Sequence, residues 1–474
     1  MTISRGIFLL AVLTLALPYL LLARQIGGIG LPETDELLWA LKNSLYQGVL
    51  SSLIALIAAF TLMPGLWWAG PRLKGVLSWA LLLPSLLPPL FVLLSFLAWV
   101  DPFPVGLIGV VFVQGFMNAG LAAVLLSRSI EDKLQGLSEM AAVMGAPRFL
   151  FLRRSFRLIV WDLAAVGIAI FAFCFASFSI PLVIGGGRAT NLEVLIYEKV
   201  RISTQMGEAL GIGLVQLAIM ALVLLIPSRP ARLEAARAER LHLVASRWGL
   251  GAAAVYVMIF WLPLLKTLPE SFRAIGQIEG LWSQIGELAL PSVALALGAG
   301  LLCLLFLLVF SIGYPQNPIV RLVRGWLAPS TALLGFAFIG WGDASPLITY
   351  ASVLALLFFL PVFRLGLDRR LESLEPQIQI ARTLGANDFL IWHRVVRPQI
   401  WGIACVLAGV VSLWAFGEFA LGRVMLSQNL NWALLSESLM SSYRIEAGLG
   451  VGFLILISGS LLFTFFWRLG HVGR

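Results

Sequence analysis

The residues that could perform chemistry in this chain are few, and their spacing argues against catalysis. Three histidines (His242, His393 and His471) and three cysteines lie far apart, without the spacing of a metal site or of a nucleophile with its base. None of the five lysines follows a glycine, so the phosphate-binding loop of an ATPase is missing. We expect no catalytic residue, no metal site and no cofactor in the chain itself.

Polar residues inside apolar runs are better candidates, because a polar side chain in a membrane span is costly unless it has a partner or a role. Gln114 and Asn118 are four residues apart and would share one face of a helix. Glu418 lies near the end of a later run. We predict that these three line a substrate pathway, although hydrogen bonds between helices explain the Gln and Asn equally well. Asp162 is expected to pair with an arginine of the nearby loop.

The elements that must position these residues are membrane helices. The chain is 60% hydrophobic and 12% charged, with a mean hydropathy of +0.95, whereas soluble domains carry about 25% charged residues. Its apolar runs reach the roughly 20 residues that a helix needs to cross a bilayer. We therefore predict an all-α polytopic membrane protein. The basic residues that give the net charge of +9 lie between these runs, where membrane orientation explains them. We therefore reject a nucleic-acid-binding interpretation.

The apolar runs predict about twelve transmembrane helices. They lie near residues 7–23, 44–66, 77–100, 105–127, 159–184, 209–227, 249–265, 288–312, 326–341, 346–363, 399–421 and 448–467. Pro84, Pro88 and Pro89 predict a kink in the third run, because proline breaks helical hydrogen bonding. The first run ends without a small-residue cleavage site, so we interpret it as a retained helix rather than a signal peptide.

Basic residues predict the orientation of these helices. If the N-terminus lies in the cytoplasm, the inside segments hold 24 of the 33 Lys and Arg residues, and the outside segments hold nine. Cytoplasmic loops of membrane proteins are enriched in Lys and Arg. The distribution therefore predicts that both termini are cytoplasmic.

Two polar segments on the predicted cytoplasmic side are copies of each other. Residues 134–158 contain "EMAAVMGAPRFLFLRRSFRL", and residues 374–398 contain "QIARTLGANDFLIWHRVVRP". At an offset of 240, ten positions are identical within a window of 31. Six predicted spans separate the copies, so both lie on the same side of the membrane. We predict two parallel halves, residues 1–227 and 249–474, joined by a basic cytoplasmic linker at 228–248.

Each copy is built like a short helix that stops at a bend. Ala141 in the first copy and Ala381 in the second have small side chains that allow close approach of another protein, and apolar residues recur around them at helical spacing. Gly145 and Gly385 then favour a sharp turn, because glycine readily adopts positive φ. A second short helix is expected to follow. Such a segment, lying across the membrane plane, would fit a groove of a soluble partner.

These segments resemble the EAA loops of binding-protein-dependent ABC importer permeases of type I, the MetI-like fold. The family pattern is Glu-Ala-Ala, three residues, Gly, nine residues and Ile-x-Leu-Pro. The corresponding residues are Glu139, Ala141 and Gly145 in the first copy and Gln379, Ala381, Gly385 and Pro398 in the second, while Met140 and Ile380 replace the first Ala. Gln379 departs from the expected Glu, and Leu158 departs from the expected Pro. Permeases with two fused halves, as predicted here, are known among thiamine and ferric-iron importers.

The resemblance implies that the loops are coupling helices that sit in clefts of ATPase subunits. The residues it implicates are Glu139, Ala141, Gly145, Ala146, Gln379, Ala381, Gly385 and Ala386. It further implies two copies of an ABC ATPase subunit, which bind ATP and Mg²⁺, and a periplasmic or lipoprotein substrate-binding protein. The chain would form the translocation pathway of an importer in the bacterial inner membrane, in contact with lipid, and would not itself be an enzyme.

The alternative is a secondary transporter driven by an ion gradient. That class usually carries buried relay charges and interrupted helices near the middle of the membrane, and these runs contain almost none. A membrane-embedded enzyme would need a convergent catalytic set, which the spans lack. The cargo stays open at this point: thiamine, ferric iron, another metal complex, a polyamine or a small anion.

Overall fold

All regular elements in the described part of the chain are helices. The computed structural model describes Leu20, Arg24 and residues 28–97, 103–224, 246–312, 330–338, 346–425 and 430–472. Eight of the described helices are long and apolar enough to cross a membrane, and α14 contains a shorter apolar segment. The predicted class, an all-α polytopic membrane protein, is confirmed, whereas the predicted number of twelve spans is not.

Long and short helices are interspersed along the chain. The helices that contain the eight long apolar segments are α2 (Thr34–Trp68), α5 (Leu107–Val143), α6 (Arg148–Phe175), α9 (Met206–Leu224), α10 (Arg247–Gln277), α11 (Leu281–Phe310), the continuous α17 (Asp388–Ile391), η3 (Trp392–Val396) and α18 (Arg397–Phe416), and α21 (Ile445–Val472). The remaining elements are α3 (Pro71–Leu86), α4 (Pro89–Leu97), α7 (Ser179–Ile184), α8 (Leu192–Arg201), α13 (Thr331–Ala337), α14 (Pro346–Val362), η2 (Phe363–Leu367), α15 (Asp368–Ser373), α16 (Glu375–Thr383), α19 (Ala420–Met425) and α20 (Trp432–Ser441). Among all of these, η2 and η3 are π-helices.

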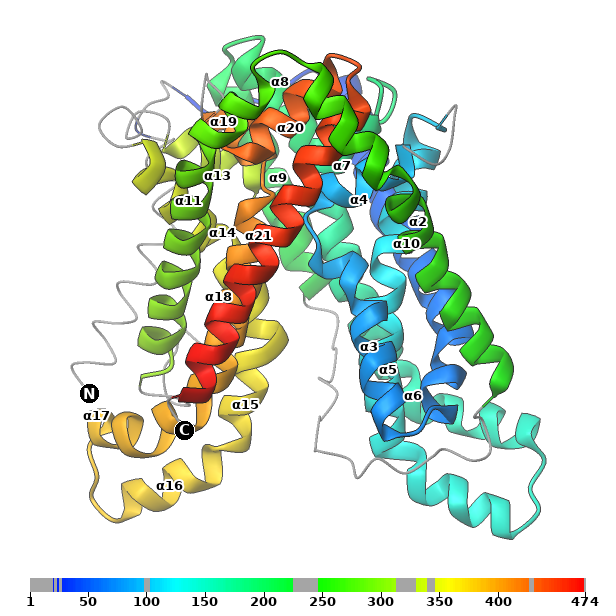
Figure 1. The fold of residues 1–474 in the computed structure, drawn as a ribbon. Coiled ribbons are helices and arrows are strands. Elements are labelled where there is room, and N and C mark those ends of the chain that lie inside the picture. The colour runs from blue at the N-terminus through cyan, green and yellow to red at the C-terminus, as the bar shows by residue number, and fades with distance from the viewer. Residues whose placement is uncertain are drawn as a thin grey trace.

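Two legs diverge from a common top (Figure 1). We call α2, α3, α5, α6 and α10 the first leg and α11, α14, α18 and α21 the second leg. One buried apolar cluster lies within the first leg and another within the second, while the largest cluster joins both at the top. The 134–158 and 374–398 loops lie at the opposite, lower ends of the two legs (Figure 1). The architecture therefore places both loops on one side of the molecule.

The third predicted span is broken rather than kinked. Leu87 is extended, with φ −78° and ψ 151°, and separates α3 from α4. A residue that precedes proline is disfavoured in the α conformation, and Leu87 precedes Pro88. The chain therefore leaves the helix at Leu86 and starts a new one at Pro89.

Several predictions fall partly or wholly outside the described residues. The first predicted span, at 7–23, lies outside them apart from Leu20. Of the ninth, at 326–341, only residues 330–338 are described, and they contain the seven-residue helix α13. The linker at 228–248 lies outside them up to Ser246, which caps α10 through its hydroxyl.

The helix that follows the linker packs against the first leg. At the crossing of α10 and α2, a Cβ added to Gly65 would lie 2.5 Å from the Gly249 backbone, so only glycine permits this approach. The Tyr256 hydroxyl donates to the Phe116 carbonyl (2.8 Å), and their rings stack with centroids 4.4 Å apart. Helix α10 also contacts α21 of the second leg. The two predicted halves are therefore interlocked, and their boundary at residue 249 stays a prediction.

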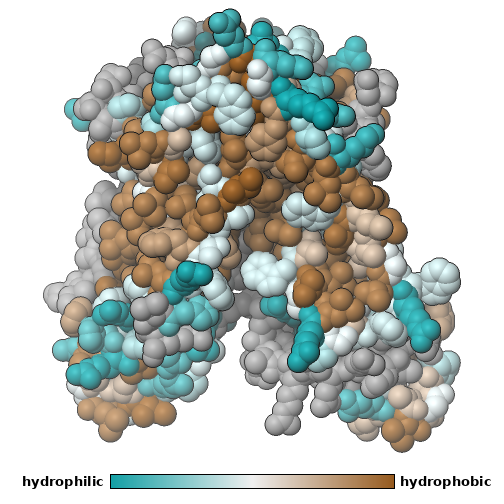
Figure 2. Space-filling view, in the orientation of Figure 1, coloured by the Kyte–Doolittle hydropathy of each residue, from teal (hydrophilic) through white to brown (hydrophobic). Residues whose placement is uncertain are grey.

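The surface carries the polarity of a membrane protein. Figure 2 shows hydrophobic side chains over the middle of both legs and hydrophilic ones gathered at the upper and lower ends. Exposed apolar residues of this middle region include Leu262 and Leu265 on α10 and Leu301 and Leu305 on α11. A band of this kind is stable when lipid covers it.

Candidate functional site

The first loop ends helix α5 with a pair of backbone hydrogen bonds. The Ala146 N–H donates to the Ala141 carbonyl (2.9 Å), and the Gly145 N–H donates to the Ala142 carbonyl (3.1 Å). Gly145 has a φ of +67°. These features define a Schellman motif, in which the left-handed residue lets the chain satisfy the last helical carbonyls. The spacing of Ala141, Gly145 and Ala146 thus has a local structural cause.

The second loop repeats this cap 240 residues later. The Ala386 N–H donates to the Ala381 carbonyl (3.1 Å), and the Gly385 N–H donates to the Arg382 carbonyl (2.9 Å). Gly385 has a φ of +82°. A Cβ added to either loop glycine would meet nothing within 4 Å in the described chain, so backbone conformation, not crowding, demands glycine here.

The tips of both loops expose apolar side chains at matching positions. Met144 is 80% exposed and Leu384, at the same position of the second loop, is 81% exposed. The same correspondence holds for the exposed pairs Met140 and Ile380, Phe149 and Phe389, and Leu150 and Leu390. Figure 2 shows hydrophobic side chains at the lower tip of each leg. Contiguous exposed apolar groups of this kind are typical of a protein interface.

The polar motif residues lie beside these tips. Glu139 and Gln379 are exposed at the same position of the two loops, while Ala141, Ala146, Ala381 and Ala386 are half-buried. The expected separate short helix is found only in the second loop, as α16. In the first loop, α5 runs without interruption to Val143, and in both loops the helix after the glycine continues into the next span.

Different interactions fix the two loops to their legs. In the first leg, Lys133 forms an ion pair with buried Asp162, which also accepts a hydrogen bond from Ser129 (2.8 Å). Lys74 pairs with buried Glu131 (2.6 Å). The prediction that Asp162 pairs with an arginine is wrong. Lys133, which lies one turn beyond Ser129 on α5, forms the ion pair instead.

The second loop is held mainly by capping and aromatic contacts. The Asn387 side chain caps α17 by accepting from the Leu390 N–H (2.8 Å). The Trp392 indole donates to the Ser311 hydroxyl at the end of α11 (2.8 Å). Arg382 forms an ion pair with Asp388 (3.0 Å), and both side chains are partly exposed.

A cavity of about 760 Å³ lies between the legs. Gln114 and Asn118 of α5 and Glu418, which follows α18, all line it. The structure therefore brings together the three residues that the sequence singled out as pathway candidates. Phe358 and Trp414 line the second-leg side of the same cavity.

The hydrogen bonds of these three residues differ. Ser51 of α2 donates to the Gln114 carboxamide oxygen (3.3 Å), and the Asn118 amide donates within α5 to the Gln114 backbone carbonyl (2.9 Å). One carboxylate oxygen of Glu418 accepts from the Leu421 N–H at the start of α19 (3.0 Å). Gln114 thus links two helices, whereas Glu418 caps a short one.

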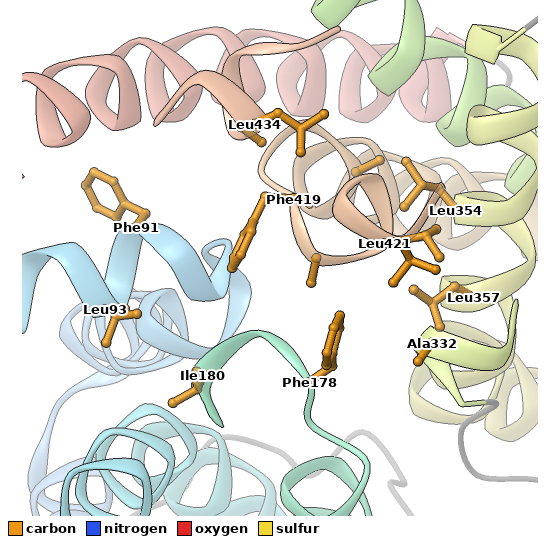
Figure 3. Close-up of a cluster of buried hydrophobic side chains, with 14 of the residues drawn as sticks. Phe91, Leu93, Phe178, Ile180, Ala332, Leu354, Leu357, Phe419, Leu421 and Leu434 are labelled. Carbon is orange, nitrogen blue, oxygen red and sulfur yellow. The ribbon is translucent and has the colours of Figure 1, made fainter. Parts of the chain in front are cut away.

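An apolar cluster borders the cavity at the end away from the loops. Phe178 and Phe419, each no more than 2% exposed, belong to it, together with Ile180 and Leu421. Figure 3 shows these four side chains in the buried cluster. Phe178, Ile180 and Leu357 also line the cavity. In this conformation, the cavity is therefore sealed by close-packed side chains at its upper end.

Polar contacts at the same end join segments far apart in the sequence, and sequence reasoning missed them. Glu193 of α8 is fully buried and accepts from the Ser330 hydroxyl (3.0 Å) and the Ala332 N–H (3.1 Å) of α13. Gln216 donates to its other oxygen (2.7 Å). Burial raises the pKa of the Glu193 carboxyl to about 7, although these hydrogen bonds favour ionisation. The signal that could have found it is a lone carboxylate in the apolar stretch "NLEVLI".

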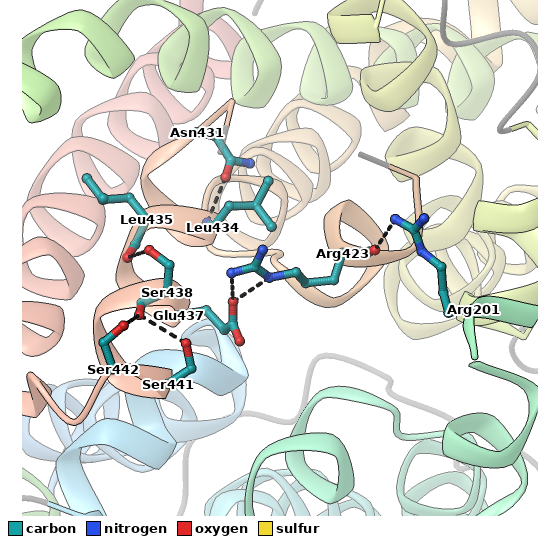
Figure 4. Close-up of polar contacts among 9 residues, drawn as sticks. All are labelled: Arg201, Arg423, Asn431, Leu434, Leu435, Glu437, Ser438, Ser441 and Ser442. Atoms are coloured by element: carbon teal, nitrogen blue, oxygen red, sulfur yellow. Dashed lines mark hydrogen bonds and ion pairs between the residues drawn. The ribbon is translucent and has the colours of Figure 1, made fainter. Parts of the chain in front are cut away.

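A second link of this kind involves arginine. The Arg201 guanidinium, at the end of α8, donates to the Arg423 backbone carbonyl in α19 (3.0 Å). The Arg423 side chain in turn pairs with Glu437 of α20. Figure 4 shows this chain of contacts at the top of the molecule. Together with the hydrogen bonds of Glu193, these contacts join α8 of the first half to α13, α19 and α20 of the second half.

Comparison with known proteins finds bacterial permeases. The chain is 29% identical to the thiamine transport system permease protein ThiP of Escherichia coli (strain K12), over 57% of this chain and 55% of that protein. It is 29% identical to ThiP of Brucella abortus (strain 2308), over 47% and 46%. It is 30% identical to ThiP of Salmonella typhimurium, over 42% and 39%. The chain thus spans about half the length of the curated relatives it matches.

Other comparisons add nothing to this likeness. No family model matches the chain, and no solved structure matches it significantly. The predicted resemblance to importer permeases is confirmed by the relatives. Over about half of its length, this chain is therefore similar to permease proteins of thiamine transport systems.

Proposed function

We propose that this chain is the permease subunit of an ABC importer and forms its pathway across the bacterial inner membrane. The observation that carries the proposal is the duplicated loop, in which the same glycine cap presents the same exposed apolar tip at the lower end of each leg. The match to thiamine transport permeases supports it. Hydrolysis of ATP would then belong to partner subunits, and this chain would not be an enzyme.

In this proposal, each loop docks in one copy of an ABC ATPase subunit, and the ATPase subunits bind ATP and Mg²⁺. The side chains that would enter the ATPase cleft are the exposed tips, with Met144 in the first loop and Leu384 in the second. Glu139 and Gln379 would lie at the polar rim, and the half-buried alanines would set how closely the partner approaches. Burying an apolar tip in a cleft stabilises the complex without requiring a specific charge.

The opposite end of the molecule would face the periplasm and receive cargo from a substrate-binding protein. Both termini would be cytoplasmic, and α21 indeed ends at the same end of the molecule as the two loops (Figure 1). Because the relatives are named as thiamine permeases, thiamine is the first cargo to test.

Transport would proceed by alternating access. ATP binding would draw the two docked loops together, and the legs would move as rigid bodies to open the upper end. That movement must part the Phe178 and Phe419 cluster and break the hydrogen bonds of Glu193 with α13. The conformation described here, in which the cavity lies between the legs below the closed upper end, would then be the inward-facing state that releases cargo to the cytoplasm.

Co-purification with the ATPase tests the docking step. Met144→Asp combined with Leu384→Asp should abolish ATPase association, because an unpaired charge is costly to bury in an apolar cleft. Gly145→Arg with Gly385→Arg should do the same. The matched control is Tyr443→Asp, which changes a side chain that is 91% exposed at the other end of the molecule. Retention of the ATPase by both double variants would show that the loops do not dock it.

A further inference from the structure

The cavity between the legs is chemically one-sided. From the first leg, α5 contributes the amides of Gln114 and Asn118. The positions 240 residues later are Leu354 and Phe358. Among the lining residues of α14 and α18, every side chain is apolar or aromatic, and Trp414 carries the one N–H group. The side-chain amides of α5 thus have no counterpart on the wall that α14 and α18 form.

The polar wall has hydrogen-bonding capacity that the described chain does not use. Gln114 is 2% exposed, and its side-chain nitrogen has no hydrogen-bond partner among the described residues. A buried donor is costly to leave without a hydrogen-bond partner. The Asn118 amide nitrogen donates to the Gln114 carbonyl and to the Cys174 Sγ of α6 (3.6 Å), and no hydrogen bond joins its side-chain oxygen to the described residues. The wall therefore offers a donor and an acceptor one helical turn apart.

The facing wall offers aromatic rings, with those of Trp414 and Phe358 tilted by 56° to each other. The Trp414 ring packs against Phe358 with centroids 5.4 Å apart, and both rings line the cavity. Aromatic side chains held in this way bind planar molecules by stacking. A volume of about 760 Å³ lies within the range of small-molecule sites.

The charges around the cavity favour a cation over an anion. Glu418 lines the cavity with a buried carboxylate. Of the two basic residues that line it, Lys74 is already paired with Glu131, and Arg128 is exposed at the loop end of α5.

We propose that this cavity holds a one-sided cargo site for a flat heteroaromatic cation. The hydrogen-bonding edge of the molecule lies against Gln114 and Asn118, and its ring face lies against Trp414. This inference rests on the proposed function and deepens it, because it assigns recognition within the membrane to the first half of the chain. The second half supplies the stacking surface and the Glu418 carboxylate.

Equilibrium binding to the full chain, co-purified with its ATPase in nanodiscs, tests the site with two radiolabelled probes. Thiamine carries a hydrogen-bonding pyrimidine edge, whereas benzylthiazolium keeps the charge and a stacking ring but lacks that edge. The unaltered chain should prefer thiamine. Gln114→Met and Asn118→Leu, which preserve side-chain size, should each weaken thiamine binding about 3- to 10-fold and remove most of the preference. Trp414→Leu should weaken both probes about equally, about 2- to 10-fold.

A matched control and the ATPase itself separate the possible failures. Gln284→Leu makes the same type of change on an exposed side chain of α11 and should leave both affinities unchanged. Unchanged thiamine affinity in Gln114→Met and Asn118→Leu, or no thiamine binding by the unaltered chain, would overturn the site. Absence of the ATPase from the purified complex would instead contradict the permease function. A folding defect alone would lower the number of binding sites for both probes and leave both affinities unchanged.

Discussion

The first leg buries charged side chains next to its loop, whereas the second leg has uncharged residues at the corresponding positions. Glu131 and Asp162 are paired with lysines in the first leg, whereas Leu371 and Gly402 occupy the positions 240 residues later. The loops in front of them nevertheless share one cap geometry and one pattern of exposed tips. The local cap therefore determines the shape of each loop, while the packing against its leg differs between the two copies.

The same contrast extends to the cavity and the upper end. Gln114 and Glu193 in the first half correspond to Leu354 and Ala433 in the second. Buried polar groups specify geometry but add little net stability, because their desolvation offsets their attraction. At these positions, the first half carries directional contacts and the second half carries small or apolar side chains. Four predictions, each with its own set of variants, test this division.

The largest expected effect is on the first-leg ion pair. Lys133→Met should destabilise the protein by about 3 kcal/mol, because it leaves the Asp162 carboxylate buried with only Ser129 as a partner. Adding Asp162→Leu should recover most of that loss. Thermal unfolding in detergent measures both. In the second loop, Arg382→Ala should cost under about 1 kcal/mol, since its pair with Asp388 is partly exposed. Equal losses in the two legs would contradict the division.

Glu193 should make the stability of the upper end depend on pH. Its pKa in the folded protein is raised to about 7, above the ordinary value of 4.5, so the folded state binds the proton more tightly. Stability is therefore fully present below about pH 4.5 and falls as the pH rises through 7, by at most roughly 3 kcal/mol. The pH dependence of the unfolding midpoint, compared between the unaltered chain and Glu193→Gln, measures this. If the unfolding midpoint of Glu193→Gln depends on pH as strongly as that of the unaltered chain, another group causes the pH dependence.

The loop glycines should respond alike in the two halves. Gly145→Ala and Gly385→Ala should each cost about 1 kcal/mol, because both backbones have positive φ. Gly136→Ala is the matched control within α5, where a Cβ meets open space and the helix gains about 1 kcal/mol. Unfolding midpoints of the three variants give the comparison. A marked difference between the two loop glycines would show that the caps are not equivalent.

The smallest effect concerns the start of the helix after each loop. Asn387→Ala removes a side-chain cap and should cost about 1 kcal/mol or less. Pro147 occupies the same position in the first loop and makes no side-chain cap. Pro147→Asn should therefore stabilise the start of α6 by a few tenths of a kcal/mol. Hydrogen exchange at the first amides of α6 and α17 reports both changes.

The features that could be predicted from sequence are local or periodic. The glycine spacing predicted both bends, because positive φ is a property of one residue. Long apolar runs predicted the spanning helices, and the spacing of Gln114 and Asn118 predicted their shared face. That they meet Glu418 in one cavity also agrees with the prediction of a pathway, although their role there stays a prediction.

The features that were missed depend on contacts between distant segments. The partner of Asp162 depends on how α5 and α6 pack, which composition does not reveal. Glu193 meets Ser330 across 137 positions, and nothing near it in the sequence signals that contact. The third run was expected to bend, but Leu87 before Pro88 ends the helix outright. The 240-residue repeat likewise gave no indication that α10 packs against the first leg.

Photo-crosslinking from the loop tips tests whether both loops dock the ATPase subunits. A benzophenone probe attached at Met144→Cys or at Leu384→Cys, in a chain whose three buried native cysteines are retained, should capture the ATPase subunit from both positions. The same probe at Tyr443→Cys, at the opposite end, should not capture it. Capture of no ATPase from either loop, or capture only from Tyr443→Cys, would contradict the account.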